Sequence, residues 1–395
     1  MELLAPAGNF DKLVTAVHFG ADAVYFAGKQ FGLRAFAGNF SDEEIVKAMD
    51  FLHAHGKKGY VTLNIVAKDS DFQNIDPYLQ LLVEAKVDGV IVSDVGVIYY
   101  LRKNFPTLNV HVSTQANVNN SFSAKFFADM GVTRIVLARE MSIDEIALLR
   151  KNLPKNVEIE AFVHGAMCIS YSGRCLLSNY LTGRDSNRGA CVQACRWQYT
   201  IREVGRKDEL PIEEDDRGTY ILNSKDLCMI EHLQELEKAG VVSLKIEGRM
   251  KSDYYVASVV NAYRRALEKK NEMSLLQEEL EKTSHRRYTT GFYFGSDDKE
   301  YLEDSMPVQT AEFVAKVVED SHDDTVKIEM RNRFKKGDVL EILSPNDAFL
   351  KKIKIEKIVD GKGNEIDDCK RVQDIVTINC PYDLKTGDIL RRDAK

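Results

Sequence analysis

Short apolar runs alternate with longer amphipathic stretches through the first two-thirds of the chain. Eight runs have the length and composition of strands: Glu2–Ala5, Ala23–Ala27, Gly59–Ile65, Gly89–Ser93, Asn109–Ser113, Arg134–Ala138, Glu158–Val163 and Val241–Ile246. Helical patterns lie between them, for example at Phe10–Phe19, Asp42–Ala54, Asp76–Ala85, Ser121–Met130 and Ser142–Leu153. Two of these begin with an S-x-x-E capping box, Ser41–Glu44 and Ser142–Glu145. Eight strands alternating with helices predict an α/β fold, a (β/α)8 TIM-like barrel. A doubly wound open sheet is the alternative, but no G-x-G-x-x-G turn follows the first strand.

One connection breaks this rhythm. About sixty residues separate the seventh strand, ending at Val163, from a helix expected near Ser224, far more than a usual strand-to-helix loop. The pattern predicts a cysteine-bearing insertion at about 165–223, and it places Cys228 in the first turn of the helix that follows. We therefore expect residues 1–300 to form the barrel with its insertion.

The pattern changes again from about Val308, where apolar residues alternate at period two. This predicts a small C-terminal all-β, barrel-like domain over residues 301–395. Two segments of similar sequence, Lys335–Leu340 and Lys385–Leu390, share the pattern K-x-G-D. We expect this pattern to form a turn before a strand. Cys369 and Cys380, isolated in this domain, are interpreted as small buried hydrophobic residues.

Composition and charge limit the classes of protein to which the chain can belong. A chain of 395 residues with 44% hydrophobic and 29% charged residues is typical of a globular protein with a large core. The net charge of −7 argues against broad attraction to nucleic acid, so an RNA substrate would need a local basic face. No apolar run is long enough to cross a bilayer, and no secretory pattern is found at the MELLAPAGNF opening. We expect a cytoplasmic protein without a membrane partner.

Four of the seven cysteines are concentrated in one stretch, Glu158–Arg196. The spacing is Cys168, six residues, Cys175, fifteen residues, Cys191, three residues, Cys195; Cys228 follows later. Disulfides are not expected in a reducing cytoplasm, and zinc sites favour paired short spacings, of which only one is found here. Iron–sulfur clusters need four thiolates and tolerate irregular spacing. An iron–sulfur cluster is therefore favoured over zinc.

Polar residues follow the expected strands. In barrel enzymes the residues that carry out the chemistry lie at the carboxyl ends of strands and in the loops beyond them. These positions are Arg34, Asn64, Ser93–Asp94, Ser113, Gln115, Asn117, Arg139–Glu140, His164, Glu247, Arg249 and Lys251. Each is also a possible capping residue. Arg139, Arg249 and Lys251 suit an anionic substrate, and His164 suits acid–base chemistry, metal ligation or a structural hydrogen bond.

Basic residues interleaved with aromatic ones indicate a surface for phosphates and unstacked bases. In the insertion these are Arg174, Arg184, Arg188 and Arg196, with Trp197 and Tyr199. Further residues of this kind are Arg264–Arg265, Lys269–Lys270 and His285–Tyr288. Solvated surface charge is the alternative interpretation.

The segments EAFVHGAMC (160–168) and GRCLLS (173–178) resemble the signature of the U32 collagenase-like peptidase family. LLAPAG, GADAVYFAG, LNSKDL (222–227) and KIEGRMKS (245–252) resemble that family too, so the resemblance spans nearly the whole chain. It implies a 4Fe–4S cluster on the motif cysteines. It also implies oxygen-independent hydroxylation of RNA, most similar to the prephenate-dependent formation of 5-hydroxyuridine at the tRNA wobble position.

On this basis we expect an enzyme that binds the tRNA anticodon region and uses prephenate as co-substrate. The predicted catalytic residues are His164, Glu247 and Arg139, and the predicted substrate-binding residues are Arg34, Asn64, Ser113, Gln115, Arg249 and Lys251. The predicted ligands are Cys168, Cys175, Cys191 and Cys195, with Cys228 as an alternative.

Two other functions stay open. One is a peptidase acting on collagen-like substrates, although the sequence contains neither H-E-x-x-H nor G-x-S-x-G. The other is a non-catalytic subunit working with a second family member.

Overall fold

The computed structural model describes residues 1–32, 38–168, 170–197, 214–215, 218–219, 224–295 and 308–394. The chain forms two compact units. The first comprises residues 1–13, 22–250 and 285–307, and the second comprises residues 14–21, 251–284 and 308–395. The two units therefore interleave along the sequence, and the expected domain boundary near residue 300 stays a prediction.

The first unit is built on a closed parallel barrel. Its strands are β1 (Glu2–Pro6), β2 (Ala23–Phe26), β3 (Lys58–Leu63), β4 (Gly89–Val92), β5 (Val110–Val112), β6 (Arg134–Val136), β7 (Glu158–Ala166) and β11 (Ser243–Ile246). Each pairs in parallel with the next, and β11 pairs with both β7 and β1, which closes the ring. The predicted (β/α)8 barrel is confirmed. The strands are buried along almost their full length, as expected for parallel strands covered by helices.

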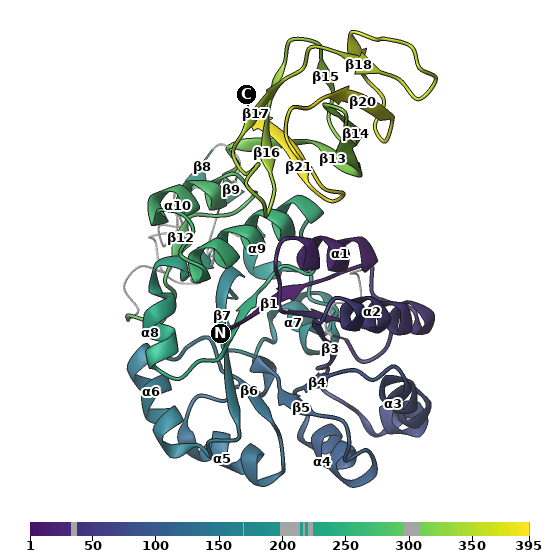
Figure 1. Cartoon of the computed structure of the whole chain (residues 1–395). Coiled ribbons are helices and arrows are strands. Elements are labelled where there is room, and N and C mark those ends of the chain that lie inside the picture. Colours follow the sequence, from purple (N-terminus) through teal and green to yellow (C-terminus); the bar gives the residue numbers. More distant parts are fainter. Residues whose placement is uncertain are drawn as a thin grey trace. The chain divides into compact units, whose positions relative to one another are not determined.

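Helices follow the strands and lie outside them (Figure 1). They are α2 (Asp42–Ala54), α3 (Ile75–Glu84), α4 (Val95–Asn104), α5 (Ser121–Asp129), α6 (Ile143–Asn152) and α8 (Leu233–Lys238). Helix α1 (Phe10–His18) follows β1 in the sequence and is divided between the two units. Both predicted capping boxes, at α2 and α6, are formed. Helix α4 lies between β4 and β5, where the predicted alternation of strands and helices requires a helix, although its VGVIYY start is rich in β-branched and aromatic residues of low helix propensity. Asp94 accepts a hydrogen bond from the Val97 amide and so caps this helix.

Strand β7 is followed by the insertion. Its described elements are α7 (Leu177–Thr182), the one-turn helices η3 (Ser186–Arg188) and η4 (Ala194–Arg196), and the short strands β8 (Glu214–Asp215) and β9 (Gly218–Thr219). The chain then returns as β10 (Asp226–Cys228), which pairs antiparallel with the end of β7 and in parallel with β12 (Tyr288–Thr289).

The expectation that Cys228 lies in the first turn of a helix is wrong. Cys228 ends strand β10, and the next regular helix, α8, begins only at Leu233, after the turn η5 (Ile230–His232). The reason is tertiary: β7 runs past its barrel neighbours, and its exposed backbone groups are satisfied by pairing with residues 226–228.

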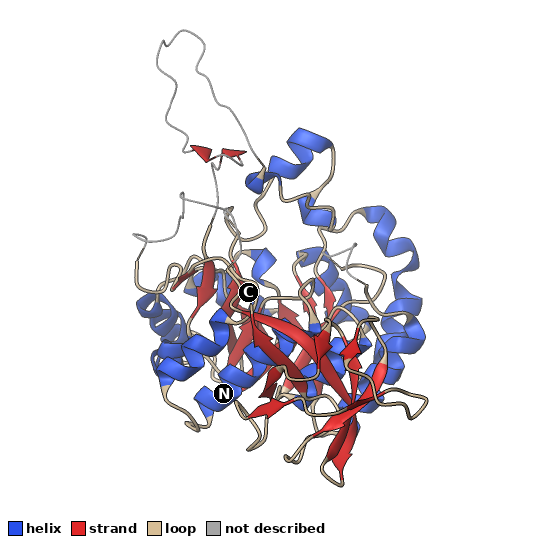
Figure 2. Ribbon diagram, turned by 90° about the horizontal axis from the view of Figure 1, so that it is seen from above, coloured by secondary structure: helices blue, strands red, loops and turns tan. Residues whose placement is uncertain are grey.

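The second unit contains helices α9 (Asp253–Leu267) and α10 (Met273–Glu281) and an antiparallel sheet. The sheet strands are β13 (Ala311–His322), β14 (Thr325–Met330), β16 (Val339–Leu343), β17 (Lys352–Lys354), β18 (Ile358–Val359), β20 (Ile375–Asn379) and β21 (Ile389–Asp393), beside a small pair of β15 (Phe334–Lys335) and β19 (Asp368–Cys369). The predicted C-terminal all-β region is confirmed, and Figure 2 shows its strands in red.

Both K-x-G-D segments form the turns that the sequence predicts. The Asp338 carboxylate accepts a hydrogen bond from the Lys335 amide at 2.9 Å, and Asp388 accepts one from the Lys385 amide at 3.0 Å. The turns lead into β16 and β21, which pair with each other. Cys369 and Cys380 are buried in the core of this sheet, as interpreted from the sequence.

Candidate active site

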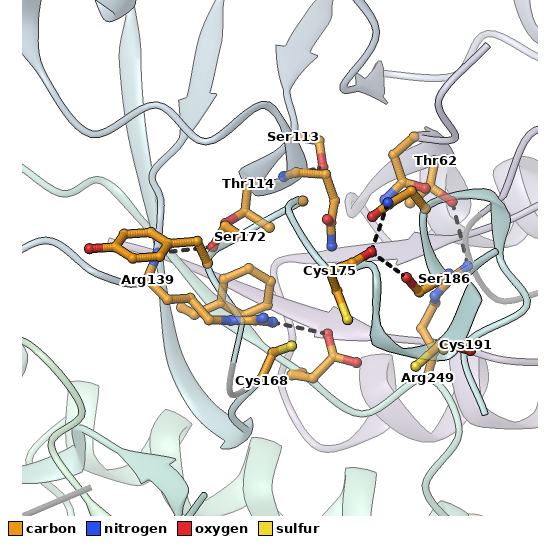
Figure 3. A pocket seen from close by; sticks show the side chains of 18 of the residues that line it. Thr62, Ser113, Thr114, Arg139, Cys168, Ser172, Cys175, Ser186, Cys191 and Arg249 are labelled. Atoms are coloured by element: carbon orange, nitrogen blue, oxygen red, sulfur yellow. Dashed lines mark hydrogen bonds and ion pairs between the residues drawn. The ribbon is translucent and has the colours of Figure 1, made fainter. Parts of the chain in front are cut away.

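A cavity of about 150 Å³ opens at the carboxyl ends of the barrel strands. Its wall combines residues that follow the barrel strands with residues of the insertion (Figure 3). Six of the residues predicted from the strand-end rule line it: Asn64, Ser113, Gln115, Arg139, Glu247 and Arg249. The structure thus brings together side chains that follow β3, β5, β6 and β11 at one rim, as the barrel topology requires.

The remaining predicted residues are placed differently. His164, on β7, is buried, and its ring lies 5.3 Å from that of Tyr288. Lys251 belongs to the second unit, where its ammonium donates to the Ser284 carbonyl and lies over the Tyr255 ring. Arg34 lies outside the described residues.

Other polar residues predicted at the rim serve local structure. The Ser93 hydroxyl donates to the Asn64 carbonyl, and Asp94 caps α4. Glu140 accepts hydrogen bonds from the amide and hydroxyl of Ser172 at 2.9 and 3.1 Å. These contacts tie the insertion to the loop after β6.

Four cysteines line the cavity: Cys168, Cys175, Cys191 and Cys195. In Figure 3 the labelled Cys168, Cys175 and Cys191 lie along the pocket between Arg139 at one end and Arg249 at the other. Within the part of the chain that the structure describes, no three His, Cys, Asp or Glu side chains lie close enough together to hold a metal ion. The thiols therefore share one cavity, without converging on one point.

The position of Cys175 is fixed through its backbone. Its carbonyl accepts hydrogen bonds from the Ser186 hydroxyl at 2.9 Å and from the Asn187 side-chain amide at 3.0 Å. Burial raises the pKa of the Cys175 thiol. Hydrogen bonds from the Ser170 hydroxyl and the Leu177 amide lower it by more, so the net pKa is below its usual value. A lowered pKa favours the thiolate, which is the form that binds metal.

Gly173 allows the insertion to pack closely against the barrel. A Cβ added there would stand 2.0 Å from the Gln115 carbonyl oxygen, and the residue has a φ of +74°. Only glycine meets both conditions without strain. The glycine of the GRC motif thus allows the cysteine segment to contact the loop after β5.

Cys228 stands apart from these four. It lies on β10 opposite His164 of β7, and it is half-buried. Cys228 is not one of the described residues that line the cavity. Its strand nevertheless pairs with the end of β7, only a few positions before Cys168.

Cations are found at both ends of the cavity. Arg139 lies over the Phe162 ring at 4.1 Å, and its Nη2 is 3.8 Å from Oε2 of Glu247. At the other end, Nη1 of the buried Arg249 donates to the Thr62 hydroxyl at 3.4 Å. Such an arrangement suits a small anion, because guanidinium groups bind carboxylates in defined geometry.

Sequence reasoning missed Lys245, which also lines the cavity. It is buried in β11, with Nζ 2.7 Å from Oε1 of the fully buried Glu160. The available signal was a lysine within an otherwise apolar strand of a barrel whose strands are buried. Lysine is almost never fully buried unless it is paired.

Several basic residues predicted to face nucleic acid are engaged in ion pairs and hydrogen bonds with other parts of the protein. Arg188 donates to both carboxylate oxygens of Asp71, at 2.9 and 3.1 Å. Arg286 is paired with buried Asp226, and in the second unit Arg265 donates to the carbonyls of Ser344 and Asn346. These residues stabilise the fold rather than offering charge to phosphates. Tyr199 and the side chain of Arg196 lie outside the described part of the chain.

The insertion exposes large side chains beside the cavity. Tyr180 is 82% exposed, Leu176 is 66% exposed, and the cavity-lining Tyr171 is 61% exposed. Arg174 and Arg184 are exposed in the same segment. We call these five residues the insertion face.

No helix in the described ranges is long and apolar enough to span a membrane.

Comparison with known proteins gives matches along nearly the whole chain. The model of peptidase family U32 matches residues 8–303, and the model of the peptidase family U32 C-terminal domain matches residues 309–391. "tRNA hydroxylation protein P1" of Bacillus subtilis is 39% identical, over 99% of this chain and 94% of that protein. "23S rRNA 5-hydroxycytidine C2501 synthase" of Escherichia coli is 38% identical, over 68% of this chain and 39% of that protein. "Collagenase" of Porphyromonas gingivalis is 34% identical, over 74% of this chain and 73% of that protein.

Proposed function

The chain belongs to peptidase family U32, and from this membership we propose that it is an RNA-modifying enzyme that hydroxylates C5 of the wobble uridine in tRNA without O2. Relatives that span most of the chain are named for tRNA hydroxylation, and one that matches 68% of the chain is named for the synthesis of 5-hydroxycytidine in 23S rRNA. The observation that carries the proposal is a single cavity that combines four thiols with arginines at both ends.

A 4Fe–4S cluster is the proposed cofactor. Cys168, Cys175, Cys191 and Cys195 would hold it, with Cys228 as the alternative fourth ligand. The donor set fits, because four thiolates are what such a cluster requires and four thiols line one cavity. When bound, the cluster supplies one-electron redox chemistry or a Lewis-acidic iron beside the substrate. To hold it, the four side chains would have to turn toward a common centre.

Prephenate is the proposed co-substrate, and its two carboxylates match the cations of the cavity. Arg249 and Arg139 are separated along the pocket, so each can bind one carboxylate. Asn64, Ser113 and Gln115 supply neutral hydrogen-bonding groups between them. Arg34 and Lys251 stay predicted substrate-binding residues.

The three predicted catalytic residues have different surroundings. Arg139 and Glu247 line the cavity as an ion pair, so they are placed to orient the substrate and to move a proton at a Glu247 carboxylate oxygen. His164 lies against Tyr288 and opposite Cys228. We therefore give His164 a positioning role beside the alternative ligand.

The insertion face is the proposed site for the RNA. Exposed Tyr171 and Tyr180 offer rings on which unpaired bases can stack, and Arg174 and Arg184 offer charge for phosphates. Single-stranded loops with splayed bases are the RNA features that proteins recognise in this way. The overall net charge of −7 makes such a local face necessary.

A second candidate function is peptidase activity, which the relative named "Collagenase" favours. Against it, the sequence lacks H-E-x-x-H and G-x-S-x-G, and a cysteine that binds a cluster is not free to attack a peptide. A non-catalytic subunit paired with a second family member is a third candidate. It would need a partner to supply the chemistry.

Mass spectrometry of tRNA nucleosides from a deletion strain tests the proposal. We expect 5-hydroxyuridine derivatives to disappear, to return with the wild-type gene, and to stay absent with Cys168→Ala. Unchanged derivatives in the deletion strain would contradict a role in tRNA. Cleavage of denatured collagen by cluster-free protein, lost in Cys168→Ala, would favour the peptidase instead.

A further inference from the structure

The base of the cavity carries a buried ammonium group. Lys245 is 4% exposed and lies in the middle of β11, between β1 and β7. Its Nζ is 2.7 Å from Oε1 of Glu160, 4.4 Å from the centre of the Tyr25 ring and 5.6 Å from that of Phe162. Tyr25, Phe162 and Lys245 all line the cavity, so the ammonium meets it between two aromatic rings.

Lys245 is the last member of a chain of charges inside the barrel. Oε2 of Glu160 lies 3.1 Å from Nη1 of Arg134, and the same nitrogen lies 2.6 Å from Oε1 of Glu2. Nη2 of Arg134 lies 2.6 Å from the Glu158 carboxylate. Barrel interiors are normally filled by branched apolar side chains, and burying charges costs several kcal/mol per ion before pairing. Because these buried charges are costly and end at the cavity, we infer that they serve binding or chemistry in the cavity.

The hydrogen bonds of the ammonium are incomplete. A lysine has three N–H donors, and within the described structure Glu160 accepts from only one of them. The two remaining donors belong to a buried cation that lines a cavity, where an anionic ligand can satisfy them.

The charge of Lys245 depends on its neighbours. Burial lowers its pKa, the carboxylates of Glu160 and Glu247 raise it, and the guanidinium of Arg134 lowers it again, so the net pKa is below its usual value. For Glu160, burial raises the pKa, but Lys245 and Arg134 hold it below its usual value. The other titratable groups nearby are Tyr25, whose ring lies under the ammonium, and fully buried His111, whose pKa is lowered by burial and by Arg134.

We propose that Lys245, together with one of the two cavity arginines, binds a carboxylate of the small-molecule co-substrate at the base of the cavity, and that Glu160 and Arg134 are positioning residues that hold its ammonium in place. The inference rests on the proposed function in one respect, namely that the ligand of the cavity is the co-substrate of the hydroxylation. Lys245 contacts the ligand, whereas Glu160 and Arg134 act through Lys245.

Ligand-induced thermal stabilisation of the purified full-length protein tests the inference, with prephenate and succinate as probes. We expect both probes to stabilise wild type, and Lys245→Met to weaken their apparent affinity at least tenfold. The control is Lys103→Met, which removes an exposed lysine from α4 and should bind like wild type. The double variant Lys245→Met/Glu160→Gln removes the pair together, so it separates lost binding from the cost of a buried Glu160 carboxylate that has lost one of its two cationic partners.

The pH dependence distinguishes binding from a structural role. In Glu160→Gln the ammonium loses the carboxylate to which it is hydrogen-bonded, while Glu247, burial and Arg134 remain, so the pKa of Lys245 falls further. Probe binding should then be lost on the alkaline side at a lower pH than in wild type. If Glu160 had only a structural role, the substitution would lower the unfolding temperature, but the pH at which probe binding is lost on the alkaline side would stay the same.

Three results would overturn the inference: no stabilisation of wild type by either probe, binding by Lys245→Met within twofold of wild type, or an unshifted alkaline limb in Glu160→Gln. Failure of the proposed function looks different. If both probes bind through Lys245 and the tRNA nucleosides of the deletion strain are unchanged, the assignment of Lys245 stands and the tRNA substrate is wrong.

Discussion

Arg188 donates to both carboxylate oxygens of Asp71 and to the carbonyl of Val66, and so joins the insertion to the segment after β3. This bidentate contact lies between residues more than a hundred positions apart in the sequence. It holds the turn η3, whose Ser186 and Asn187 in turn hold the Cys175 carbonyl. A surface ion pair thereby contributes to the position of a predicted cluster ligand.

Arg188→Ala should destabilise the insertion more than the barrel. The pair is partly exposed, so we expect a loss of about 1 kcal/mol or less at pH 7. Hydrogen bonding to Arg188 lowers the pKa of Asp71, so the contribution is complete above the normal pKa of aspartate and is lost as the pH falls toward the lowered one. Unfolding free energies of wild type and variant at pH 7 and pH 3 would check this, since the difference should shrink at pH 3. An equal difference at both values would contradict the pairing.

Gly173→Ala should displace the cysteine segment. The new Cβ would meet the Gln115 carbonyl, and the positive φ adds strain on the order of 1 kcal/mol or more. Gly183→Ala is a matched control, because Gly183 also has a positive φ, +71°, but nothing within 4 Å of its Cβ position. Hydrogen exchange of the insertion should speed up much more in the first variant than in the second. Equal protection would show that the close approach does not hold the insertion in place.

Replacement of the cysteines one at a time should define the ligands. Anaerobically purified wild type should be brown, with about four irons per chain. Cys168→Ala, Cys175→Ala and Cys191→Ala should each lose iron, whereas Cys369→Ala should keep it. Of Cys195→Ala and Cys228→Ala, we expect one to lose iron and the other to retain it. Stoichiometric zinc in a colourless wild type would remove the cluster from the proposal.

Tyr180→Ala should weaken RNA binding with little effect on stability. The side chain is 82% exposed, so the unfolding free energy should change by no more than about 0.5 kcal/mol. Loss of one stacked base costs about 1–3 kcal/mol, so affinity for an anticodon stem-loop should fall roughly fivefold or more. Phe122→Ala, at an 87% exposed aromatic residue on α5, is the control and should bind normally. Equal affinities of the two variants would exclude Tyr180 from the interface.

Buried thiols in the second unit should be nearly inert. Burial raises the pKa of Cys369 to about 11, so at pH 8 roughly one thiol in a thousand is ionised. Alkylation of Cys369 by iodoacetamide at pH 8 should therefore require unfolding, as judged by peptide mass spectrometry with and without denaturant. Rapid labelling of the folded protein would show that this core opens.

The barrel and its rim could be predicted because both follow from local patterns. Buried parallel strands are mostly apolar, and polar residues such as Asn64 and Arg249 follow the ends of strands. The ion pairs could not be predicted, since nothing near Arg188 or Arg286 in the sequence indicates that Asp71 or Asp226 lies beside it. The place of Lys245 in an apolar strand signals a buried and therefore paired lysine, but nothing near it in the sequence indicates that the partner is Glu160.

The antiparallel pairing of Leu227 with Gly165 brings the two ends of the insertion together at neighbouring Cα positions. The segment between them could therefore be replaced as one unit. A tight hairpin joining β7 to β10 would close the same gap and leave the ring of eight strands intact. Evolution can lengthen, shorten or exchange this segment while the scaffold beneath it stays intact. Grafting the corresponding segment of a relative is then a direct way to alter which substrate the scaffold serves.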